Sequence, residues 1–259
     1  MLDSKIVITY IAILCHGDWN EIAAFIKERR PIDLEECLKV VSALPCHAIT
    51  IMEADYPAAL KNALQPPFVL FYQGNLSLLE NHRRCVALLG SRNDADYGEA
   101  QGKRFAKALA SEGATIISSI SKGVNEKVLK EAVPFGKAVA VLPCGVDVYY
   151  PAEFSELQRK IKDNGLLISE FPPGTQPSPK TFPARNRIIA GLSSYVLVAS
   201  THQGEGTLST IGIALSQGKT VGCFPYRLDE GNVNNNLILE GAEMIIDPDD
   251  VLHHCGLKE

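Results

Sequence analysis

The sequence predicts an α/β protein of the extended Rossmann-like type, with a doubly wound, mostly parallel sheet and a small N-terminal helical appendage. From residue 84 onward, short apolar runs alternate with longer amphipathic runs, which is typical of βα units. The apolar runs are nearly continuous, as expected for parallel strands that are buried on both faces. The chain has 259 residues, of which 46% are hydrophobic, and this suffices for one large domain with a small addition.

The first 54 residues are expected to form a small helical domain. The apolar run at residues 6–15 is too short to span a bilayer, which needs about 20 apolar residues, so it is interpreted as a buried helix. Two further helices are indicated by acidic pairs with the spacing of a capping box, Asp18 with Glu21 and Asp33 with Glu36.

Residues 55–83 are interpreted as a connector that ends in an extended segment, because prolines and a glycine interrupt them. The Rossmann-like domain is expected at residues 84–259. Six segments in it have the length and composition of strands: residues 85–89, 115–119, 138–142, 166–169, 195–199 and 221–224. Residues 97–111 carry small and apolar side chains at helical spacing, which predicts a helix that covers the sheet. Ligands of such sheets bind beyond the carboxyl ends of the strands.

Two of these strand ends carry residues suited to phosphate. Gly90, Ser91 and Arg92 follow the first strand, where a glycine permits a tight exit, free backbone N–H groups accept an anion and an arginine binds phosphate with two donors. Lys122 and Gly123 follow the second strand in a serine-rich segment that opens a helix. An ordinary strand-to-helix turn explains the second segment equally, because the spacing of a Walker motif is absent.

A third segment combines cations with an aromatic ring. Pro183 is expected to be the first residue of a helix whose unpaired N–H groups lie beside cationic side chains and a phenylalanine. An aromatic ring among cations suits a stacked base and its phosphates. The candidate binding residues of this segment are Lys180, Phe182, Arg185, Asn186 and Arg187. Two arginines two positions apart cannot share one helix face, so one of them is expected in a structural ion pair instead.

The fourth segment follows the strand at residues 195–199. Gly206 and Thr207 at the start of a helix can bind an anion, whereas Glu205 would repel phosphate if its side chain pointed inward.

Composition argues against several classes of protein. Seven cysteines without a C-x-x-C pair indicate reduced thiols in the cytoplasm, and histidine and cysteine spacing matches no zinc site. We therefore expect no metal, no cofactor and no membrane association. Cys144 lacks an identifiable base, so no catalytic residue is assigned. The net charge of −5 attracts no nucleic acid globally, so any DNA site must be a local basic cleft.

Together these segments resemble the DprA (Smf) family of bacterial DNA-processing proteins, over about residues 56–251. The resemblance lies in GSR at 90–92, SKG at 121–123, VLPCGVDVYYP at 141–151, GLLISEFPPG at 165–174, FPARNRIIAGLS at 182–193, GTLST at 206–210 and LILEGA at 237–242. It implies a homodimeric, non-enzymatic protein that binds single-stranded DNA, protects incoming DNA and helps load the RecA recombinase during natural transformation. It also implies DNA contacts by Arg92, Phe182 and a lysine that corresponds to Lys180.

The chain departs from the family pattern in its loops. Asn125 replaces an acid, Leu129 replaces a histidine, and Glu205 stands where relatives have serine. Two alternatives therefore stay open. One is an enzyme resembling the nucleoside-phosphate phosphoribohydrolases, although Thr210 occupies the position of their catalytic glutamate. The other is a RecA-interacting scaffold that has lost DNA binding.

Overall fold

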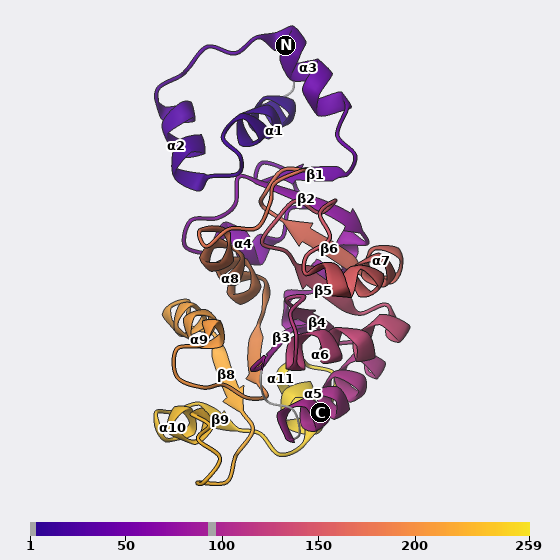
Figure 1. The fold of residues 1–259 in the computed structure, drawn as a ribbon, viewed down its shortest axis with the longest axis vertical. Helices are drawn as coiled ribbons and strands as arrows, with labels where there is room; N and C mark the ends of the chain where they lie inside the picture. The colour runs from indigo at the N-terminus through magenta and orange to yellow at the C-terminus, as the bar shows by residue number, and fades with distance from the viewer. Residues whose placement is uncertain (1–3, 93–96) are drawn as a thin grey trace.

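The computed structural model describes residues 4–92 and 97–259. These residues form one nine-stranded sheet with the order β1-β2-β6-β5-β4-β3-β7-β8-β9 (Figure 1). The strands are β1 (His47–Thr50), β2 (Val69–Gly74), β3 (Cys85–Leu89), β4 (Thr115–Ser118), β5 (Ala138–Val141), β6 (Leu166–Ser169), β7 (Tyr195–Val198), β8 (Thr220–Cys223) and β9 (Glu243–Met244).

The strands from β3 to β9 pair in parallel, and they make up the doubly wound part of the sheet. The chain starts in the middle of this part, at β3, whose neighbours are β4 and β7. Strand β2 runs antiparallel to both β6 and β1 and extends the sheet at one end. The α/β, mostly parallel architecture expected from the sequence is thereby confirmed.

Helices cover both faces of this sheet. One face is covered by α5 (Tyr97–Ser111), α6 (Val124–Ala132), α7 (Ser155–Asn164) and α11 (Pro248–His254), and the other by α4 (Ala58–Lys61), α8 (Thr181–Leu192), α9 (Gly206–Ser216) and α10 (Asn234–Leu239). Alternate residues of β3 divide between the two hydrophobic cores: Val86 and Leu88 pack with α5, whereas Ala87 and Leu89 pack with α8. Strands β3 to β7 are thus buried on both sides, which explains their continuous apolar sequences.

The N-terminal helices α1 (Ser4–Leu14), α2 (Trp19–Lys27) and α3 (Leu34–Ser42) lie together beyond β1, at one end of the elongated molecule (Figure 1). The carboxylates of Asp18 and Asp33 accept hydrogen bonds from the first N–H groups of α2 and α3, so the sequence predicted both helix starts correctly. The side chain of Trp19 joins α2 to the segment before β2: its Nε1 donates to the carbonyl of Pro66 at 2.9 Å.

Some boundaries differ from those expected. Strands β4, β5 and β7 end one residue earlier, and β8 begins and ends one residue earlier. Strand β1 was not expected, and the extended segment at the end of the connector is β2, which is a full member of the sheet. The division of the chain at residues 54 and 83 stays a prediction. Short 3₁₀ turns lie at Leu76–Leu79, His82–Arg84, Val133–Phe135 and Ala152–Phe154.

Among residues 4–92 and 97–259, no helix combines the length and the apolar character needed to cross a membrane.

Candidate functional site

A cavity of about 350 Å³ opens beyond the carboxyl ends of β3 and β4 and between the first turns of α8 and α9. This is the edge at which ligands of parallel sheets bind. Seven of the residues proposed from the sequence line it: Gly90, Arg92, Phe182, Arg185, Asn186, Gly206 and Thr207. Segments that are far apart in the chain therefore meet at one site.

Arg185 is the buried cation of this cavity. Its side chain is held by a hydrogen bond from Nε to Oδ1 of Asn186 at 2.9 Å, and its guanidinium lies 5.8 Å from the centre of the Phe182 ring. Burial and, to a smaller extent, the charge of nearby Arg92 lower the pKa of Arg185 to about 10, so the group stays protonated at neutral pH.

Arg92 and Arg185 face the same cavity. Within the described part of the chain, neither guanidinium forms an ion pair with a carboxylate. Two cations that share a cavity repel each other, and an anion between them relieves that repulsion. The arrangement therefore favours an anionic ligand.

Glu205 lines the same cavity, but its carboxylate is bound to the wall. Oε1 accepts a hydrogen bond from the Ser91 hydroxyl at 2.6 Å, and Oε2 accepts from the backbone N–H of His202 at 3.0 Å and from the Thr201 hydroxyl at 3.4 Å. The side chain points inward, which is the orientation expected to be unfavourable for phosphate. Because a cavity remains beside it, Glu205 reduces the positive charge of the site without filling it.

The loop after β3 binds no anion through its first two N–H groups. The N–H of Gly90 donates to Oδ1 of Asn125 at 2.9 Å, and the N–H of Ser91 donates to Oγ of Ser200 at 3.1 Å. The expectation of free backbone donors at this strand end was wrong, because a side chain at the start of α6 and another in the loop after β7 already accept from them.

Asn125, at the start of α6, is a site residue that the sequence analysis noted only as a departure from the family. Its Nδ2 donates to the hydroxyls of Ser119 and Ser121 at 2.9 and 3.0 Å, while its Oδ1 accepts from Gly90. These contacts join the exits of β3 and β4, and all three polar residues line the cavity. The serine-rich segment after β4 was the only sequence indication of this network.

Lys122 and Gly123 stand beside the cavity rather than in its lining. Lys122 is exposed, and Gly123 has φ of +86° at the N-cap of α6. A Cβ atom at Gly123 would overlap the carbonyl oxygen of Ser91 and lie 2.9 Å from Cα of Arg92. A glycine is required here so that the helix start can approach the loop that carries Arg92.

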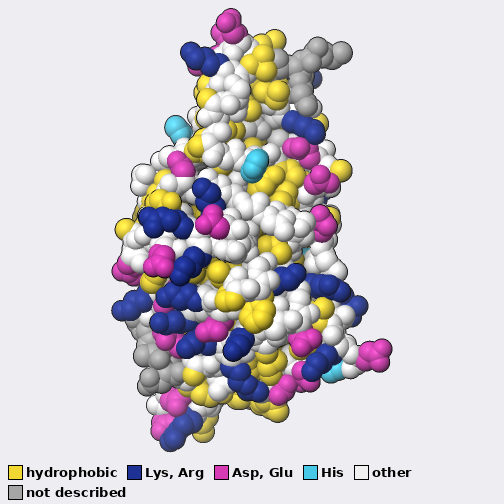
Figure 2. Space-filling model, turned by 90° about the vertical axis from the view of Figure 1, so that its right-hand side faces the viewer, with side chains coloured by type: hydrophobic (Ala, Val, Ile, Leu, Met, Phe, Trp, Pro, Cys, Tyr) yellow, Lys and Arg dark blue, Asp and Glu magenta, His cyan; other side chains and the backbone are white. Residues whose placement is uncertain are grey.

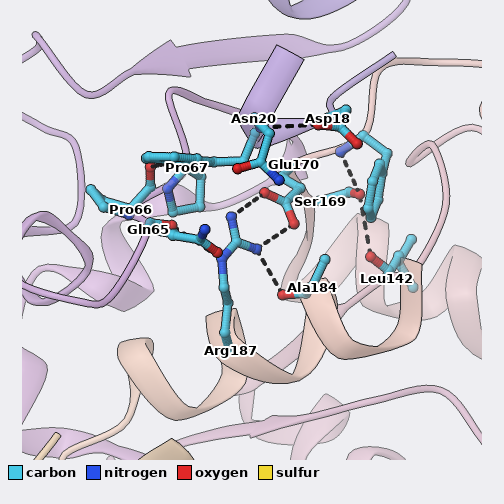
Figure 3. Close-up of polar contacts among 12 residues, drawn as sticks. Asp18, Asn20, Gln65, Pro66, Pro67, Leu142, Ser169, Glu170, Ala184 and Arg187 are labelled. Carbon is cyan, nitrogen blue, oxygen red and sulfur yellow. Dashed lines mark hydrogen bonds and ion pairs between the residues drawn. The ribbon is translucent and has the colours of Figure 1, made fainter. Parts of the chain in front are cut away.

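Arg187 and Lys180 lie on the other side of α8. The guanidinium of Arg187 forms a bidentate ion pair with the buried carboxylate of Glu170 and also donates to the carbonyls of Ala184 and Gln65 (Figure 3). Burial raises the pKa of Glu170, and the Arg187 charge opposes that rise. Arg187 is therefore the arginine in a structural ion pair, as the two-residue spacing predicted for one of the two.

Arg187 and Lys180 line a second cavity, of about 600 Å³, between α8 and the loop that joins α1 to α2. Helix α8 begins at Thr181, so Pro183 is its third residue rather than its first as expected. Its proline ring still falls in the first turn, where a missing N–H costs no intrahelical hydrogen bond.

In residues 4–92 and 97–259, no cluster of three or more histidine, cysteine, aspartate or glutamate side chains is arranged to hold a metal ion.

Comparison with known proteins places this architecture in a family. The family model for DNA recombination-mediator protein A matches residues 47–256. DNA processing protein DprA of Streptococcus pneumoniae is 35% identical over 233 residues, which cover 89% of this chain and 81% of that protein. Protein Smf of Escherichia coli is 35% identical over 80% of this chain, which spans 56% of the longer relative.

Solved structures agree with the sequence matches. The crystal structure of DprA from Streptococcus pneumoniae superposes with a TM-score of 0.79 and 32% identity, covering 92% of this chain and 85% of that one. DNA processing protein A of Helicobacter pylori, whose structure was determined for its single-stranded DNA binding mode, gives a TM-score of 0.74 and 28% identity over 81% of this chain and 95% of that one. The chain therefore belongs to the DNA recombination-mediator protein A family, the family of the DNA-processing proteins DprA and Smf.

Proposed function

We propose that the cavity between α8 and the loop after β3 binds single-stranded DNA. The observation that carries the proposal is the convergence of Arg92 and Arg185 on one cavity without a carboxylate pairing either of them in the described residues. A phosphodiester placed between them receives charge-assisted hydrogen bonds from both, which are about twice as strong as neutral ones.

Phe182 extends the argument from phosphate to nucleotide. Its ring is partly exposed, lines the cavity and lies next to the Arg185 guanidinium. A nucleobase stacked on such a ring contributes about 1–3 kcal/mol whatever its identity, so binding is expected to tolerate any sequence. A flipped-out or unpaired base fits this arrangement, whereas a stacked duplex offers no free base face. The Helicobacter pylori relative described for single-stranded DNA binding supports the same ligand class.

A titration tests the proposal directly. Fluorescence anisotropy of labelled oligothymidine at two salt concentrations measures both the affinity and its salt dependence. Arg92→Ala is expected to weaken binding about tenfold and to make the log–log salt slope shallower by about 0.7, the value for one released phosphate contact. The matched control is Arg30→Ala, which removes an exposed arginine of the N-terminal helical region and should retain the affinity and the salt slope of the wild type. Lack of binding by the wild-type protein at low salt, or full affinity in Arg92→Ala, refutes the proposal.

The homodimer is proposed at the β9 edge of the sheet. Leu239, Met244 and Ile246 are exposed apolar side chains around this outermost strand. A second copy that covers them removes apolar area from water and pairs the strand edge. Sedimentation equilibrium of Met244→Lys should show a shift toward monomer if this edge forms the dimer, and an unchanged dimer contradicts it.

Family membership supports four further parts of the proposal: the protection of incoming DNA, the loading of RecA, a role in natural transformation and a cytoplasmic location. Pull-down of purified RecA with and without oligothymidine tests the RecA interaction. RecA capture by a protein that shows no oligonucleotide binding would favour the scaffold alternative over DNA binding.

We further propose that the protein binds without catalysing a reaction. Thr210 stands in the cavity where the phosphoribohydrolase-like pattern has its catalytic glutamate, and its hydroxyl donates to the carbonyl of Gly206 at 3.4 Å. Release of free base from adenosine monophosphate would overturn this assignment.

A further inference from the structure

The aromatic surface of the site continues past the cavity. The ring of Tyr150 contacts that of Phe182, with 6.1 Å between the ring centres and an interplanar angle of 60°. Tyr150 also lies close enough to Arg185 to affect the pKa of its guanidinium. Neither fact follows from sequence spacing, because Tyr150 belongs to the loop after β5, whereas Phe182 belongs to α8.

The preceding residue of this loop, Tyr149, is paired with a cation. Tyr149 is 45% exposed, and the guanidinium of Arg159 on α7 lies 5.2 Å from the centre of its ring. In the part of the chain that the structure describes, Arg159 forms no ion pair, unlike its neighbour Lys160, which pairs with Glu156 at 2.8 Å. The pair thus places an aromatic ring and a cation side by side at the surface.

The acids near this pair have other partners. Glu156 forms its ion pair with Lys160, and Lys160 and, to a smaller extent, the charge of Arg159 lower the pKa of Glu156. Asp147, the acid of the same loop, has its carboxylate bound by the N–H of Gly174 at 2.9 and 3.1 Å. Helix α7 carries three basic and two acidic residues, and α5 carries three basic residues and one acidic residue. Helix α6 has equal numbers of basic and acidic residues. The face formed by these helices shows Lys and Arg side chains gathered across its middle, with Asp and Glu among them (Figure 2). This face is locally basic on a chain whose net charge is −5.

We propose that Tyr149, Tyr150 and Arg159 form a second nucleotide subsite, in which a base of single-stranded DNA leaving the cavity stacks on tyrosine and its phosphate is bound by Arg159. The inference rests on the DNA-binding function proposed above and assigns a direction to the strand, from Phe182 over the loop after β5 to α7. Alternating aromatic rings and cations are the arrangement by which proteins hold successive nucleotides without reading their sequence.

The double variant Tyr149→Ser/Arg159→Gln tests the subsite, since both side chains are exposed and their loss leaves the cores intact. We expect its affinity for an oligothymidine of about 16 nucleotides to fall about tenfold and the salt slope to become shallower by about 0.7, because one stacked base and one phosphate contact are lost. An oligothymidine of about 4 nucleotides, which the cavity and Phe182 can hold, should lose less affinity. Lys160→Gln, on the same helix but next to Phe154 and Lys130, is the control and should bind both as the wild type does.

The outcomes separate the two proposals. Suppose that the wild type and Lys160→Gln bind the longer oligonucleotide and that Arg92→Ala loses binding. If the double variant then keeps the affinity and the salt slope of the wild type, the cavity binds DNA and the subsite does not exist. A tenfold loss in the double variant with an unchanged salt slope also contradicts the role of Arg159. If the wild type binds no oligonucleotide, both proposals fall.

Discussion

The hydroxyl of Ser91 donates a hydrogen bond to the carboxylate of Glu205 at 2.6 Å, and this contact ties the loop after β3 to the loop after β7. The Ser91 hydroxyl and the N–H of His202 both donate to this carboxylate, and a phosphate oxygen in the same place would accept from the same two donors. The chain's own anion therefore occupies these donors, and an external phosphate depends on Arg92 and Arg185.

Neutralising Glu205 is expected to strengthen DNA binding. In Glu205→Gln the side-chain oxygen can still accept from Ser91, but the negative charge beside the bound phosphate is gone. The expected gain is about fivefold in affinity, or about 1 kcal/mol, the scale of one unit-charge interaction near a wet surface. Anisotropy at low salt measures it, with the exposed Glu240→Gln as the control. Weaker binding in Glu205→Gln would mean that the carboxylate contributes to the ligand site.

The two arginines of α8 should separate stability from binding. Arg187→Met leaves the buried Glu170 carboxylate without its partner and should lower the free energy of unfolding by about 3–5 kcal/mol. Arg185→Met removes a buried cation that forms no ion pair among residues 4–92 and 97–259, so it should change stability far less and weaken oligothymidine binding about tenfold or more. Urea denaturation and anisotropy on both variants check this. The reverse assignment, with Arg187→Met stable but unable to bind, would contradict the structural role of the ion pair.

Gly123→Ala is expected to disturb the site through its backbone. The residue has φ of +86° and ψ of −139°, a region that is essentially restricted to glycine, and the new methyl group would press on Ser91 and Arg92. The expected cost is about 3 kcal/mol of stability, with weaker oligothymidine binding in the protein that remains folded. Gly231→Ala, where φ is +64° and no atom lies within 4 Å of the added Cβ, should cost only about 1–2 kcal/mol and leave binding unchanged. Equal effects of the two variants would show that the contact with Ser91 and Arg92 is unimportant.

His82 should make stability depend on pH. Burial and the charge of Lys219 lower the pKa of His82, and its ring bridges the carbonyl of Leu192 and the Lys219 ammonium at 3.1 and 3.2 Å. The unfolded chain therefore binds a proton at a higher pH than the folded chain does, and folding loses stability as pH falls below about 6.5. Urea denaturation near pH 7.5 and pH 5.5 should show a larger loss in the wild type than in His82→Gln. Parallel losses in both proteins would exclude His82 as the cause.

The sequence predicted the sheet well because burial on both faces leaves continuous apolar runs, such as residues 85–89, that need no long-range information to be recognised. Strand β1 was missed since it has four residues and only two are buried, so its composition alone does not distinguish it from a loop. What makes it a strand is its antiparallel pairing with β2, which lies about 20 residues further along the chain.

The site was predicted in its residue types but not in its hydrogen bonds. The spacing of Arg185 and Arg187 indicated that the two would face different ways, yet the choice between them depended on Glu170, which a strand end brings beside Arg187. The N–H groups of Gly90 and Ser91 were expected to be free because their partners are distant in the chain: Asn125 lies at the start of α6 and Ser200 in the loop after β7. Such partners are a property of the packed fold and not of local sequence.

Strand β1 also has a consequence for shortened forms of the protein. It pairs with one edge of β2, and helices α1–α3 lie beyond it (Figure 1). A fragment that starts at residue 55 would lack β1 and leave the backbone donors and acceptors of β2 unpaired along that side. Open strand edges of this kind recruit further strands from other molecules. The fragment is therefore expected to self-associate and to precipitate more readily than the whole chain, even though every described residue that lines the cavity between α8 and α9 would be retained.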